Sequence, residues 1–66
     1  MQNTASLLLQ NWSKIQSTLN KTLSSEDYRS LIVAKQQGIN SLIYWFINHP
    51  DIARIIQIIL GKYVAF

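Results

Sequence analysis

Few residues in this chain have side chains that could take part in catalysis. The 66 residues include three acidic residues, one histidine and no cysteine. Glu26 and Asp27 are adjacent, so their side chains diverge on a helix, and a role in capping that helix accounts for both. His49 could act as a base, but beside Pro50 it is better interpreted as a helix-end residue with a local hydrogen bond. We expect no enzymatic activity, because a catalytic site needs a nucleophile, a base and an orienting group in mutual reach.

The same inventory predicts neither a metal site nor a cofactor site. No histidine and carboxylate share the i, i+4 spacing of paired metal ligands. Two glycines, Gly38 and Gly61, are too few for a phosphate-binding loop. The lack of cysteine excludes a disulfide framework and fits a cytoplasmic protein. The first residues lack the basic and apolar segments of a targeting signal, and no window of the sequence is long and apolar enough for a transmembrane helix.

The longest apolar run, Leu42 to Ile47, has six large side chains within a charge-free interval from Gln36 to Pro50. Six consecutive helical positions point in all directions, so this run must be covered on nearly every side. A chain of 7.6 kDa forms one domain, residues 1–66, and scaling predicts a folded surface of roughly 4,300 Å². Because 48% of the residues are hydrophobic, part of them should lie in an interface. We therefore expect a homodimer, a higher homo-oligomer or a complex with another protein.

Hydrophobic periodicity predicts an all-α fold of three antiparallel helices. The first helix should span residues 4–23, because apolar side chains recur there every three or four residues. Ser24 to Asp27 has the serine and acidic residues of a helix start. The second helix should then span 26–49 and the third 50–60, since Pro50 and Asp51 suit a first helical turn. Beyond Gly61, the last residues are expected either as a docked tail or as an extension of the third helix.

Gly38 leaves two interpretations of the second helix open. In the first, which we favour, the helix continues through Gly38 at a cost of about 1 kcal/mol. In the second, Gly38 ends one helix and Asn40 or Ser41 caps another, giving four helices in total. In both cases, we expect the helices to pair with those of a second copy into a larger bundle.

The segment Val33-Ala34-Lys35-Gln36-Gln37-Gly38-Ile39 resembles the turn of helix-turn-helix repressors, in which a small residue and a glycine let two helices meet closely. The resemblance covers about a third of the chain and implies a DNA-binding regulator. The chain departs from that pattern after Asn40 and Ser41, where the recognition helix would present bulky hydrophobic residues rather than groups that read base edges. Gln37 also stands where that family buries an apolar residue.

Our main hypothesis is a non-enzymatic interaction module, such as an adaptor, a small regulator or an accessory subunit. Tryptophan and tyrosine are enriched among the residues that anchor interfaces. The predicted inter-chain surface consists of Tyr44, Trp45, Ile47, Ile55, Ile58 and Phe66. Two alternatives stay open: the DNA-binding regulator, and a protein that lies on a membrane surface through the apolar final helix.

Overall fold

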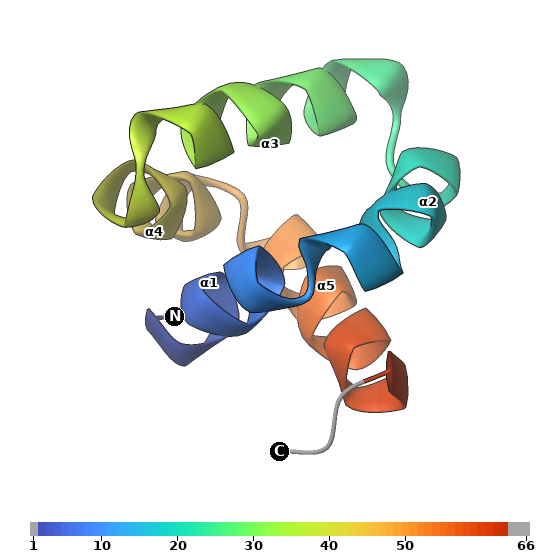
Figure 1. Ribbon diagram of the computed structural model, residues 1–66. Helices are drawn as coiled ribbons and strands as arrows, with labels where there is room; N and C mark the ends of the chain where they lie inside the picture. The colour runs from blue at the N-terminus through green and yellow to red at the C-terminus, as the bar shows by residue number, and fades with distance from the viewer. Residues whose placement is uncertain (1, 64–66) are drawn as a thin grey trace.

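The computed structural model describes residues 2–63, and within this range every regular element is an α-helix (Figure 1). The predicted all-α class is therefore confirmed. The described residues contain five helices rather than three, because two of the predicted helices are interrupted. The helices are α1 (Gln2–Gln10), α2 (Trp12–Thr22), α3 (Ser25–Gln37), α4 (Ile39–Asn48) and α5 (Pro50–Tyr63).

The first interruption falls at Asn11, so the prediction of one continuous helix over residues 4–23 is wrong. Asn11 has φ −116° and ψ 19°, outside the helical range. Its side-chain amide donates a hydrogen bond of 2.9 Å to the carbonyl oxygen of Leu7, and its backbone N–H donates one of 3.0 Å to the same oxygen. Asparagine side chains compete with the backbone for hydrogen bonds in this way, and here the side-chain bond accompanies the bend between α1 and α2.

The second interruption is Gly38, the single residue between α3 and α4. Its φ of +115° and ψ of 175° lie in a region that is almost restricted to glycine. Its N–H donates to the oxygen of Lys35 (3.3 Å), and its oxygen accepts from the N–H of Leu42 (3.1 Å). The favoured prediction of a helix continuing through residue 38 is wrong. The alternative is right about the break, but α4 begins at Ile39 without a side-chain cap, so neither Asn40 nor Ser41 caps it.

Two predicted helix starts are confirmed. The hydroxyl oxygen of Ser24 accepts a hydrogen bond of 3.1 Å from the N–H of Asp27, which caps α3. α5 begins at Pro50, as its fixed φ and missing N–H favour. α5 continues through Gly61 to Tyr63, so Gly61 does not end it.

Neighbouring helices cross one another instead of lying antiparallel, which corrects the predicted arrangement. In Figure 1, α3 lies across the view, and α4 lies at the C-terminal end of α3 and is seen nearly end-on. α5 runs crosswise to α1. The molecule measures 25 × 23 × 20 Å, close to equal in all directions. One-residue junctions at Asn11, Gly38 and His49 turn the chain sharply, and so short helices wrap around a common centre.

All five helices contribute to one hydrophobic core, in which α1, α4 and α5 each pack on at least three other helices. α4 packs on α1, α3 and α5, while α5 also packs on α1 and α2. The largest fully buried side chains are Leu8, Ile15, Leu19, Leu31, Leu42, Phe46, Ile56 and Leu60. Ile39 and Tyr63 fall in the apolar periodic pattern of their helices but are exposed.

A single copy of the chain closes this core. Its accessible surface is 4323 Å², which matches the roughly 4,300 Å² expected for a monomeric protein of this mass. In the described part of the chain, every buried side-chain nitrogen and oxygen has a hydrogen-bond partner. Among residues 2–63, none of the helices combines the length and the apolar character needed to cross a bilayer.

Candidate functional site

A groove of about 420 Å³ lies between α3 and α4. Its volume is within the range of about 300 to 1,000 Å³ that is typical of ligand pockets. The groove exists because Gly38 folds α4 back beside α3, so that side chains from both helices face one space. Its lining residues are Ser30, Val33, Ala34, Gln37, Asn40, Ser41, Tyr44, Trp45 and Asn48.

The side chain of Trp45 in this groove is held in place by contacts with three residues. Its indole N–H donates a hydrogen bond of 2.7 Å to the hydroxyl oxygen of Ser30 in α3. Its ring stacks on the imidazole of His49, with ring centroids 4.1 Å apart, and meets the ring of Phe46 edge-on. Only 7% of Trp45 is exposed. The side chain therefore links α3 to α4 and to the junction residue His49, and it forms one wall of the groove.

The outer face of α4 is formed by Asn40, Tyr44, Ile47 and Asn48. These residues follow the i, i+4, i+7, i+8 spacing of one helical face, and all four are exposed. Tyr44 is 67% exposed and Ile47 is 62% exposed, the highest values among the large hydrophobic side chains that the structure describes. α4 contains no charged residue. This face is thus apolar and aromatic at its centre and carries neutral amides around it.

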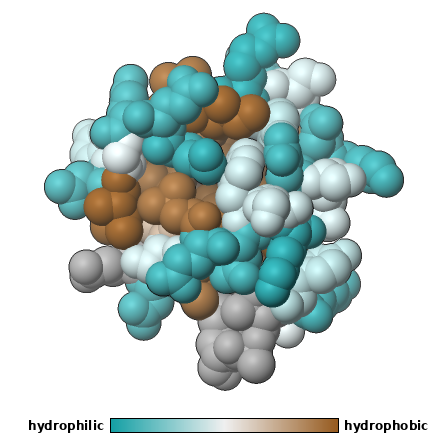
Figure 2. All heavy atoms as spheres, viewed as in Figure 1, coloured by the Kyte–Doolittle hydropathy of each residue, from teal (hydrophilic) through white to brown (hydrophobic). Residues whose placement is uncertain are grey.

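Further exposed hydrophobic residues lie beside this face. Val33 of α3 lines the groove and is half exposed, and Ile39 begins α4. Figure 2 shows hydrophobic residues gathered on the side of the molecule where α4 lies, with polar residues around them. Large exposed apolar patches with a polar border are typical of surfaces that bind a partner.

The structure separates the six residues of the predicted interface. Tyr44 and Ile47 share the outer face of α4, as expected, and Ile58 is exposed on α5. Ile55 is half-buried and packs against the core. Trp45 is a correction: it is buried within the chain, because its N–H is satisfied by Ser30 and its ring is covered by His49. Phe66 lies outside the described residues.

The residues considered for catalysis or metal binding stay apart. His49 ends α4, and its Nδ1 lies 2.8 Å from the carbonyl oxygen of Trp45, which is the predicted local hydrogen bond. Within residues 2–63, no three side chains of the His, Cys, Asp and Glu types gather where they could hold a metal ion.

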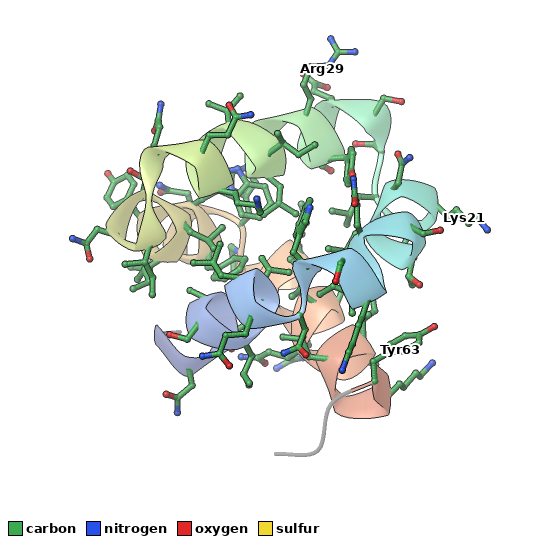
Figure 3. All side chains as sticks on the ribbon, viewed as in Figure 1. Lys21, Arg29 and Tyr63 are labelled. Carbon is green, nitrogen blue, oxygen red and sulfur yellow. The ribbon has the colours of Figure 1, made fainter. Side chains whose placement is uncertain are left out.

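The basic side chains do not form one surface beside α4. Figure 3 shows Lys21 projecting from α2 and Arg29 projecting from α3 in different directions. The ammonium nitrogen of Lys35 lies 4.9 Å from the centre of the Trp12 ring, a distance typical of a cation–π contact. The helix at the recognition position of the helix-turn-helix resemblance presents Tyr44 and Ile47 outward and has no cation. Groove-reading helices contact base edges with arginine, lysine, asparagine or glutamine, and of these types the outer face of α4 has Asn40 and Asn48.

Sequence reasoning missed the α3 side of the groove. Ser30 and Gln37 were not predicted to line a binding surface, because the periodic pattern does not reveal how two helices cross. One signal was present: a buried indole N–H needs a hydrogen-bond partner. Several hydroxyl and amide side chains could have supplied that partner. Ser30 is the partner because the bend at Gly38 brings α3 and α4 together.

Comparison of the chain with family models, with curated proteins and with solved structures finds no match.

Proposed function

We propose that this protein is a non-enzymatic interaction module that self-associates through the outer face of α4. The observation that carries the proposal is the exposure of Tyr44 and Ile47 on a helix with no charge. Burial of apolar surface is the main favourable term in protein association. Tyrosine is also among the residues that contribute most at interface centres.

A second copy fits this face because the face is electrically neutral. In a two-fold symmetric dimer the same residues of both copies meet, so charges near the axis would repel one another. The chain has a net charge of +3, yet none of its charged residues lies on α4. A highly charged partner would find no complementary group on this face, whereas a second copy meets its own uncharged surface.

An interface of ordinary size would have to extend beyond the outer face of α4. A standard interface covers about 800 Å² on each partner, which is about a fifth of the 4323 Å² surface of the chain. The outer face of α4 and the rim of the groove would form its centre. The amides of Asn40 and Asn48 would lie beside the apolar residues and supply polar contacts.

Tyr44 and Ile47 are held on a rigid support, which favours binding. Trp45 fixes α4 against α3 through its hydrogen bond to Ser30. The amide of Asn48 donates to the carbonyl oxygen of Tyr44 (3.2 Å) near the end of the helix. A surface that is ordered before binding loses less conformational entropy when the partner arrives.

The proposed dimer covers a surface and leaves the core of each copy unchanged. Each chain already encloses its own core side chains. A variant that prevents association should therefore remain a folded monomer. This separates the proposal from a subunit that folds only on assembly.

Sedimentation equilibrium at micromolar concentration tests the proposal. The wild-type chain should have twice the mass of 7.6 kDa, and Ile47→Lys should be monomeric, because a dimer would bury two unpaired ammonium groups. Gln36→Lys, which adds the same charge at an exposed position on α3, should remain dimeric.

Ile58→Lys decides whether the α5 residues of the predicted interface belong to the same surface. Ile58 is nearly as exposed as Ile47 but lies on another helix. An unchanged dimer would limit the interface to α4, and dissociation would extend it to α5. A wild-type chain that is monomeric throughout the micromolar range would refute self-association.

A further inference from the structure

Residue 38 divides the chain into two halves that complete one core. The contacts of α4 with α1 and α3, and those of α5 with α1 and α2, all join one half to the other. Hydrogen bonds also cross between the halves: Trp45 donates to Ser30 (2.7 Å), and the amide of Gln57 donates to the hydroxyl oxygen of Thr4 (3.1 Å). Neither half therefore encloses its apolar side chains alone.

The connection between these halves is a single residue in an unusual conformation. Gly38 is the one residue with positive φ in the described range 2–63. A Cβ atom added to Gly38 would meet no atom within 4 Å, so a side chain at residue 38 would be opposed by the backbone conformation and not by a steric clash. The N-terminus of α4 also lacks a side-chain cap. A helical Gly38 would join α3 and α4 into one helix and give the first N–H groups of α4 intrahelical partners.

We infer that two copies of this chain exchange their α4–α5 halves by straightening at Gly38. In the exchanged dimer, α3 and α4 form one continuous helix, and α4–α5 of each copy packs on α1–α3 of the other. Every contact between the halves is formed again, and only the backbone at residue 38 changes. Exchange of identical elements is a low-cost route to a dimer, and short strained connections favour it.

This inference does not rest on the proposed function, because the outer face of α4 takes no part in the exchange. The face stays exposed in both the closed and the exchanged form. The two modes of association also differ in rate. A dimer held by surface contacts dissociates without unfolding, whereas exchanged halves must first separate from each other, which exposes the core.

Gly38→Ala is the variant that tests the exchange. The added methyl group contacts nothing, so the variant acts only through the backbone. Alanine disfavours the bent conformation and favours the continuous helix. The dimerisation constant should rise by at least about 100-fold, because each of the two junctions contributes a factor of about 10.

Gly61→Ala is the matched control. It adds the same methyl group to a helix, but within α5 and away from the junction. Sedimentation equilibrium should give the wild-type association constant for Gly61→Ala and a much larger one for Gly38→Ala.

The double variant Gly38→Ala/Tyr44→Lys separates the exchange from surface association. It should remain dimeric, and after dilution it should return to monomer at the unfolding rate of the chain. A folded Gly38→Ala monomer at all concentrations would overturn the inference. So would loss of the dimer on adding Tyr44→Lys.

If Gly38→Ala does not fold, the Tyr44→Lys chain tests the exchange instead. It is refolded at high concentration and then diluted. A dimer fraction that disappears only at the unfolding rate supports exchange, and monomer alone refutes it.

Discussion

Trp45 shows how one buried polar group can determine the role of a residue. It lies in the most apolar part of the sequence, beside the exposed Tyr44, and helical spacing alone suggested an exposed interface anchor. In the structure its N–H reaches Ser30 and its ring is covered by His49, so that the side chain is buried. Its function is to fix α4 against α3 and thereby to position Tyr44 and Ile47.

Ser30→Ala should lower the free energy of unfolding by about 1 kcal/mol, since a partly buried indole N–H loses its partner. Urea unfolding followed by circular dichroism measures the change. Ser41→Ala makes the same alteration in the groove at a residue that is not the partner of Trp45, and it should have a smaller effect. Equal stability of Ser30→Ala and the wild type would contradict the assigned hydrogen bond.

At the scale of the helices, local signals determine where some helices start. Ser24 caps α3 through its hydroxyl group, and α5 starts at Pro50. Each of these features depends on residues within one turn of the helix end. Both were predicted from the sequence for that reason.

Ser24→Ala should destabilise the protein by about 1 kcal/mol, because the N–H of Asp27 loses its cap. The measurement is again urea unfolding, with the slope of the transition checked for constancy. Ser25→Ala changes the next residue, which is the first of α3, and should be close to neutral. If Ser25→Ala lowered the free energy of unfolding and Ser24→Ala did not, the cap would be assigned to the wrong residue.

The breaks at Asn11 and Gly38 depend on more than local signals. Gly38 permits both a bend and a continuous helix, and packing of α4 on α1 and α3 accompanies the bend. Asn11 stands in an apolar pattern that continues from Leu8 to Leu19, so the pattern alone predicts one helix. The crossing of α3 and α4, and therefore the groove, follows from the bend. For this reason the sequence predicted the exposure of Tyr44 and Ile47 but not the burial of Trp45.

For the whole molecule, the abundance of hydrophobic residues has two consequences. Most large apolar side chains are buried or half-buried within one chain, which closes a core with a surface of 4323 Å². The remaining exposed ones include Tyr44 and Ile47 on α4, and these carry the proposed association. The sequence predicts a partner that completes the core. In the structure one chain encloses that core, and we propose instead that a partner covers the exposed residues.

Phe46→Ala should unfold much of the protein at 25 °C. Phe46 is fully buried, and removal of a buried phenylalanine ring costs about 3 to 5 kcal/mol. That loss is comparable to the total stability of a domain of this size, about 3 to 5 kcal/mol. Circular dichroism should show a marked loss of helix, whereas Ile47→Ala, at an exposed position of the same helix, should retain it. Full helicity of Phe46→Ala would mean that the core does not depend on the Phe46 ring.

The most direct test of the central claim is the mass of the wild-type chain and of Tyr44→Lys, measured by sedimentation equilibrium at the same micromolar concentrations. For chains that have not been refolded at high concentration, the account predicts a dimer for the wild type and a helical monomer of 7.6 kDa for Tyr44→Lys, because Tyr44 lies at the centre of the outer face of α4. A monomeric wild type, or a Tyr44→Lys chain that associates as strongly as the wild type, would contradict it.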